Sequence, residues 1–126
     1  MTGERILVVE DNEKNMKLFR DVLVATGYRT LEATTGGEAV DMASEHTPDL
    51  VLMDIQLPDL DGVEALHRLR ADERTATIPV LALTAQAMRG DRERFLAEGF
   101  DGYVSKPVNV REFLGTVRQH CEGRLG

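Results

Sequence analysis

Short, continuous runs of apolar residues alternate with amphipathic stretches five times along the chain. The strongest runs do not alternate in polarity, which is typical of strands buried on both faces of a parallel sheet. In chain order the runs are Ile6–Val9, a weaker Arg29–Ala33, Leu50–Met53, Val80–Leu83 and Tyr103–Val104. This order predicts an α/β fold in which helices cover both faces of one sheet.

The stretches between the runs carry helix start and stop signals. Asn12 is a candidate N-cap and Gly27 a candidate stop for the first helix. A capping residue followed three positions later by glutamate occurs at Thr35–Glu38, Asp61–Glu64 and Asn109–Glu112. The stretch Met88–Glu98 has a weaker start, because Gly90 lies within it, and Gly99 as its stop.

Five strands that alternate with five helices predict a doubly wound (βα)5 parallel sheet. Right-handed crossovers leave few topologies, and the flavodoxin-like strand order 2-1-3-4-5 is favoured among them. A chain of 126 residues has the usual size of one domain, so we expect residues 1–126 to form a single domain.

The composition excludes several classes of function. A net charge of −7 and the lack of a basic patch argue against direct binding to nucleic acid. The longest apolar runs have four residues, too short to span a membrane, and the N-terminus lacks the layout of a signal peptide. The one cysteine, Cys121, continues the apolar stripe of the last helix, and no internal disulfide can form. We therefore expect a cytoplasmic protein.

Polar residues that can do chemistry come directly after the strong runs. They are Glu10 and Asp11 after the first run, Asp54 after the third, Thr84 after the fourth, and Ser105 with Lys106 after the fifth. Because parallel strands of an open sheet end at the same edge, these side chains are expected to converge there. Each of these residues alone is an ordinary strand-end residue, but their occurrence together at the ends of the strong strands predicts a functional site.

The charges at this edge suggest its chemistry. Three crowded carboxylates repel one another, and a hard divalent cation relieves the repulsion. Mg²⁺ prefers oxygen ligands and keeps several waters, so two carboxylates and a backbone carbonyl are sufficient. The Lys106 ammonium and the Thr84 hydroxyl are then placed to donate to an incoming phosphoryl oxygen. An aspartate can carry such a group as an acyl phosphate.

Glu10-Asp11, Asp54, Thr84-Ala85 and Lys106-Pro107, in this order and spacing, resemble the receiver domain of bacterial two-component response regulators. The resemblance covers nearly the whole chain and implies a CheY-like fold. Segments such as Val9–Glu13, Leu52–Pro58 and Ser105–Pro107 look most like the DivK group of single-domain regulators. That group controls cell-cycle progression and polar development in alphaproteobacteria, so the resemblance implies a role of this kind.

The resemblance also implies a role for each site residue. Asp54 is the expected nucleophile, modified to 4-aspartylphosphate. Asp11, Asp54 and the Gln56 backbone carbonyl are the expected Mg²⁺ ligands, with Glu10 acting directly or through water. Lys106 is expected to pair with the phosphoryl group, and Thr84 and Tyr103 to form a switch pair. Many receivers have aspartate where this chain has Glu10, and the longer glutamate side chain keeps the charge but changes the reach of the ligand.

The expected partners come from the same resemblance. A sensor histidine kinase or a histidine phosphotransferase would supply the phosphoryl group. The receiver pattern occupies almost all of the sequence, so we expect no output domain, and the signal would pass to a downstream protein, such as another kinase, by direct contact. The protein would then catalyse its own phosphorylation and dephosphorylation without being an enzyme that turns over a substrate.

Three other functions share parts of this pattern. An electron-transfer flavoprotein would need small and hydroxyl residues after the first strand, where Glu10-Asp11 would repel the flavin phosphate. A phosphatase of the haloacid dehalogenase type would need a second aspartate as general acid at Gln56, and an amide does not transfer protons in this way. A pseudo-receiver tends to lack the acceptor or the lysine, and both residues are present here.

Overall fold

The computed structural model describes residues 3–84, 91–106 and 109–125. Within these ranges, five parallel strands form one sheet in the order β2-β1-β3-β4-β5, as predicted. The strands are β1 (Arg5–Val9), β2 (Arg29–Ala33), β3 (Leu50–Asp54), β4 (Val80–Thr84) and β5 (Gly102–Ser105). The helices are α1 (Glu13–Ala25), α2 (Gly36–His46), α3 (Gly62–Ala71), α4 (Asp91–Glu98) and α5 (Val110–Leu125).

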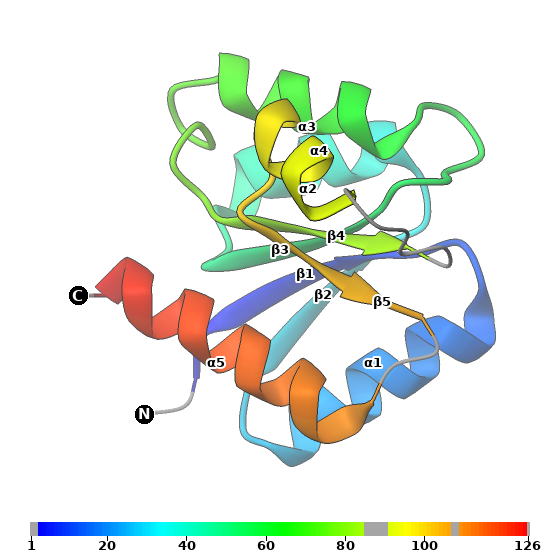
Figure 1. Ribbon diagram of the computed structural model, residues 1–126, viewed down its shortest axis with the longest axis vertical. Helices are drawn as coiled ribbons and strands as arrows, with labels where there is room; N and C mark the ends of the chain where they lie inside the picture. Colours follow the sequence, from blue (N-terminus) through cyan, green and yellow to red (C-terminus); the bar gives the residue numbers. More distant parts are fainter. Residues whose placement is uncertain (1–2, 85–90, 107–108, 126) are drawn as a thin grey trace.

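Helices cover both faces of the sheet (Figure 1): α1 and α5 lie on one face, and α2, α3 and α4 on the other. Side chains of β1 alternate between the two layers, since Ile6 and Val8 pack toward α1 and α5 while Leu7 and Val9 pack toward α2 and α3. Burial on both faces explains why the central strands are apolar without a break.

Most helices start and stop where the sequence predicts. Asn12 accepts a hydrogen bond from the Asn15 N–H and caps α1, and Gly27 comes after that helix with a positive φ of 105°. The side chain of each other capping residue accepts a hydrogen bond from the backbone N–H of the glutamate three positions later. These pairs are Thr35–Glu38, Asp61–Glu64 and Asn109–Glu112. The helix expected over Met88–Glu98 is observed as Asp91–Glu98, and its expected first residues lie outside the described ranges.

Cys121 is buried in the layer between the sheet and helices α1 and α5, as its place in the apolar stripe predicts. Among the described residues, no helix is both long enough and apolar enough to cross a membrane.

Candidate functional site

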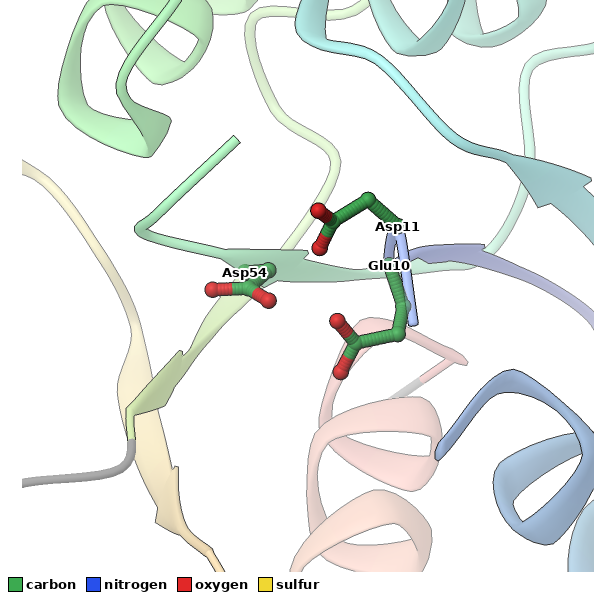
Figure 2. Close-up of side chains that lie close together, drawn as sticks. All are labelled: Glu10, Asp11 and Asp54. Carbon is green, nitrogen blue, oxygen red and sulfur yellow. The ribbon is translucent and has the colours of Figure 1, made fainter. Parts of the chain in front are cut away.

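Three carboxylates converge at the carboxyl edge of the sheet. Glu10 and Asp11 come after β1, and Asp54 is the last residue of β3, the strand that pairs directly with β1. Each residue offers one carboxylate oxygen to a group in which these atoms all lie within 4.8 Å of one another. Figure 2 shows the three side chains pointing toward one another across this edge. The predicted convergence of acidic residues is therefore observed.

Lys106 brings the one described cation that contacts this cluster. Its Nζ donates to Glu10 Oε1 at 2.6 Å and to Asp54 Oδ2 at 3.0 Å. Its backbone N–H donates to the Thr84 carbonyl at 2.7 Å, which anchors the segment after β5 to the end of β4. The ammonium is thus held between two carboxylates from β1 and β3, a contact that the sequence did not predict.

Burial and shared hydrogen bonds set the charges of this site. Burial, together with a hydrogen bond to Asp54, raises the pKa of Glu10 to about 7, while Lys106 acts in the opposite direction. Burial alone would lower the pKa of Lys106, but its hydrogen bonds to Glu10 and Asp54 outweigh burial and raise it. The ammonium therefore stays charged, and Glu10 is the carboxyl group that takes up a proton near neutral pH.

The loop after β3 holds the Asp54 carboxylate from a second side. The Gln56 N–H donates to Asp54 Oδ1 at 2.8 Å, leaving Oδ2 to Lys106. The loop returns to β3 at Gly62, whose N–H donates to the Ile55 carbonyl at 3.1 Å. A Cβ on Gly62 would lie 2.6 Å from the Asp54 carbonyl oxygen, so only glycine fits this approach.

Thr84 and Tyr103 lie on the two strands beyond Asp54. Thr84 ends β4, the neighbour of β3, and is only 3% exposed. Tyr103 lies on β5, where it is half-buried and its ring centroid is 5.9 Å from that of Phe95 on α4. The side chain of Tyr103 therefore connects the edge strand with the helix that comes after β4.

The donor set fits a hard divalent cation. Glu10, Asp11 and Asp54 offer only carboxylate oxygens, which Mg²⁺ and Ca²⁺ prefer over sulfur or nitrogen ligands. Asp11 is exposed while Glu10 and Asp54 are buried, so one side of the group faces solvent. That arrangement suits Mg²⁺, which usually keeps several of its waters. The backbone carbonyl of Gln56 belongs to the loop that comes directly after β3.

Two features of the site were not recognised in the sequence. Gly62 permits the start of α3 to approach the Asp54 backbone closely. In the sequence, the feature that could have indicated this contact is the Asp61-Gly62 pair at a helix start. Asp59 accepts hydrogen bonds from Gly36 and Gly37 at the start of α2. The sequence gives less indication of this contact, because an aspartate after a proline is common in any turn.

Comparison with known proteins gives a consistent result. Residues 6–118 match the family described as the response regulator receiver domain. The polar-differentiation response regulator DivK of Brucella ovis is 50% identical over 115 residues, which are 91% of this chain and 94% of that protein. The DivK of Brucella anthropi has the same identity and coverage.

Solved structures agree with this assignment. The receiver domain of the sensor histidine kinase PA1611 from Pseudomonas aeruginosa PAO1, described with a magnesium ion coordinated in its active site cleft, is 38% identical with a TM-score of 0.88. The comparison covers 95% of this chain and 98% of that one. A CheY-like receiver domain protein from Methanospirillum hungatei JF-1 is 29% identical with a TM-score of 0.85, over 97% and 96% of the two chains. This chain therefore belongs to the response regulator receiver domain family.

Proposed function

We propose that this protein accepts a phosphoryl group on Asp54 from a histidine kinase or a histidine phosphotransferase and passes the signal on by protein–protein contact. The observation that carries the proposal is the setting of the Asp54 carboxylate. It lies in reach of the Lys106 ammonium on one oxygen and of the Gln56 N–H on the other, beside two further carboxylates. Membership of the receiver family supports the same reaction.

The proposed step is a direct transfer to the carboxylate. An Asp54 oxygen forms a bond to phosphorus while the P–N bond of the donor phosphohistidine breaks, and the imidazole nitrogen leaves with the electron pair. The Lys106 ammonium then moves from the free carboxylates to a phosphoryl oxygen, where its positive charge offsets the negative charge of the group. The Thr84 hydroxyl, at the end of the neighbouring strand, donates to another phosphoryl oxygen.

Asp11, Asp54 and the Gln56 carbonyl would hold Mg²⁺, with Glu10 as a further ligand or through water. The bound cation would neutralise charge on the phosphoryl oxygens and on the crowded carboxylates. The carboxylate-only donor set supports this assignment, as does the magnesium ion described for the related Pseudomonas aeruginosa receiver. By the same chemistry, the protein would catalyse both the gain and the hydrolysis of its phosphoryl group.

The names of the relatives suggest a biological role. Each of the Brucella proteins is named a polar-differentiation response regulator. We place this protein in cell-cycle and polar development control, acting in the cytoplasm on a downstream protein such as another kinase. A groove of about 380 Å³ between β5 and α5, lined in part by Tyr103, Asn109 and Phe113, offers such a partner a recessed surface.

Mass spectrometry after incubation with acetyl phosphate and Mg²⁺ tests the proposal. The wild-type protein should gain one phosphoryl group that is stable in acid and labile in base. Asp54→Asn, a nearly isosteric change that removes the nucleophile, should gain none. Asp49→Asn is the matched control, since Asp49 lies at the opposite edge of the sheet where β3 begins. Full labelling of Asp54→Asn would overturn the assignment of the acceptor.

A further inference from the structure

The loop between β3 and α3, residues 55–61, is held at its tip by an aspartate. Asp59 Oδ1 accepts a hydrogen bond from the Gly36 N–H at 2.8 Å, and Asp59 Oδ2 accepts one from the Gly37 N–H at 3.0 Å. These donors are the first two residues of α2. The contact therefore joins the loop after the acceptor strand to a helix that starts 23 residues earlier.

The start of α2 is shaped to receive this loop. A Cβ on Gly36 would lie 2.9 Å from Leu60 Cδ1, and a Cβ on Gly37 would lie 3.3 Å from Asp59 Oδ2. Gly36 is buried although it begins a helix, because the loop covers it. Two adjacent glycines lower helix propensity, so their presence here is better explained by the close approach of the loop than by the helix itself.

Asp59 is not needed as the ordinary cap of α2. Thr35 already fills that role, since its side chain accepts a hydrogen bond from the Glu38 N–H at 3.1 Å. Glu38 Oε1 in turn accepts from the Thr34 N–H at 2.7 Å. The N–H groups of Gly37 and Gly36 lower the pKa of Asp59, so its carboxylate stays ionised and the contact is charge-assisted.

The other end of the same loop contacts the acceptor. The Gln56 N–H donates to Asp54 Oδ1, and Gln56 pairs with Asp61 in an isolated antiparallel bridge. Gly62 then packs against the Asp54 carbonyl. Gln56 therefore lies between two points at which the loop is held, the Ile55–Gly62 hydrogen bond at its base and the Asp59 contacts at its tip.

We infer that Asp59 is a positioning residue for the acceptor site: by docking the loop tip on α2, it holds the Gln56 backbone in place to orient the Asp54 carboxylate and to present a carbonyl to the metal. The metal part of this inference rests on the proposed function. The Gln56 N–H···Asp54 contact stands independently of it.

Two measurements on the whole protein test the inference. One is the exchange rate of the Gln56 amide hydrogen without metal, and the other is the Mg²⁺ dissociation constant from calorimetry. In Asp59→Ala, the Gln56 amide hydrogen should exchange faster. Mg²⁺ should bind about threefold to tenfold more weakly, which is a smaller loss of affinity than is seen when a residue in direct contact with a metal ligand is removed. Labelling by acetyl phosphate should recover at saturating Mg²⁺.

Thr35→Ala is the matched control, because it removes a hydrogen bond from the same helix start but leaves the Asp59 contacts in place. It should lower the melting temperature without either change at the site. If Asp59→Ala does not fold, Asp59→Asn replaces it, since its amide oxygen keeps one acceptor and intermediate effects are expected.

The outcomes separate this inference from the proposed function. If Asp59→Ala matches Thr35→Ala in both measurements, Asp59 only stabilises α2 and the inference is wrong. If the wild type binds no Mg²⁺, the proposed function loses its metal, and the exchange rate of Gln56 alone decides whether Asp59 holds the loop. If the wild type binds Mg²⁺ but Asp54 is never labelled, the acceptor assignment fails while the positioning role stands or falls on both measurements.

Discussion

Lys106 Nζ lies 3.0 Å from Asp54 Oδ2, although 52 residues separate the two in the chain. The contact exists because β3 and β5 flank β4, so the ends of all three strands meet at one edge. The same ammonium donates to Glu10 at 2.6 Å. Lys106 therefore compensates the negative charge of two buried carboxylates, and under the proposed function we expect phosphorylation of Asp54 to draw the ammonium away from at least one of them.

Removing this ammonium should destabilise the metal-free protein. In Lys106→Met, Glu10 and Asp54 would be left buried without a cation, which we expect to cost about 1–3 kcal/mol, less than for a deeply buried pair because Lys106 is partly exposed. Urea unfolding at about pH 8, where ordinary carboxyl groups are ionised, measures the loss. In a Glu10→Gln background the loss should shrink, because one of the two carboxylates is already neutral. An equal loss of unfolding free energy in both backgrounds would show that Glu10 and Lys106 are not energetically coupled.

Asp11→Ala should separate metal binding from stability. Asp11 is exposed and belongs to the cluster of three carboxylates, so its removal should abolish both Mg²⁺ binding and labelling. Without Mg²⁺ the variant should be as stable as the wild type or more so, by up to about 1 kcal/mol, because a repelling charge is gone. Melting curves with and without Mg²⁺ test both expectations. Asp41→Ala, at an exposed aspartate on α2, is the control and should leave Mg²⁺ binding unchanged. A lower metal-free melting temperature for Asp11→Ala would contradict the close packing of these carboxylates.

Glu10 should make the stability of the metal-free protein depend on pH. Its pKa is raised from 4.5 to about 7, chiefly by burial, so between these values the folded state holds a proton that the unfolded state releases. The contribution to the free energy of unfolding is complete below about pH 4.5 and is lost as pH rises through about 7.

The comparison of wild type with Glu10→Gln isolates the contribution of Glu10 to the free energy of unfolding, since both proteins share every other titrating group. The wild type should lose stability relative to the variant between about pH 4.5 and 7. Saturating Mg²⁺ should flatten the difference, because a cation favours the ionised carboxylate. Parallel profiles in the metal-free protein would show that the pKa of Glu10 is not raised.

Gly62 offers a test of the packing against the Asp54 backbone. A Cβ there would lie 2.6 Å from the Asp54 carbonyl oxygen and 2.7 Å from Ile55 Cα, so Gly62→Ala must displace backbone. We expect a loss of about 1–3 kcal/mol and slower labelling of Asp54. Gly115→Ala is the control, since a Cβ at this position on α5 would have no atom within 4 Å, and it should stabilise the helix by about 0.5–1 kcal/mol. Equal stability of the two variants would contradict the close contact.

The sequence was sufficient to predict the features that strand order determines. Continuous apolar runs indicate buried parallel strands, and the residues after such strands must meet at one edge of the sheet. The meeting of Glu10, Asp11 and Asp54 could therefore be expected from the sequence alone. It was not sufficient for contacts set by side-chain geometry. The pairing of Lys106 with Glu10 depends on how a long, flexible chain resolves the charges around it. The contact of Asp59 with α2 joins a loop to the start of a helix, and no local sequence pattern encodes the distance between the two.

The final prediction concerns the route by which the signal leaves the site. Phosphorylation of Asp54 adds negative charge and acceptor oxygens at the end of β3, next to the strand that ends in Thr84. We expect the Thr84 hydroxyl to move to one of these oxygens and Tyr103 to swing inward. Because the ring of Tyr103 packs against Phe95, this movement would change the surface formed by α4, β5 and α5.

Thr84→Ala should therefore still accept a phosphoryl group from acetyl phosphate but lose most of the gain in partner affinity that phosphorylation brings. A coupling of about 1–3 kcal/mol is enough for such a switch. Tyr103→Ala should alter partner affinity and leave Mg²⁺ binding nearly unchanged, because Tyr103 lies outside the group of three carboxylates. Titration of a cognate histidine kinase against wild type and both variants, with and without beryllofluoride, measures the coupling. If Thr84→Ala keeps the full gain, the signal reaches the α4–β5–α5 surface by a route that does not include this hydroxyl.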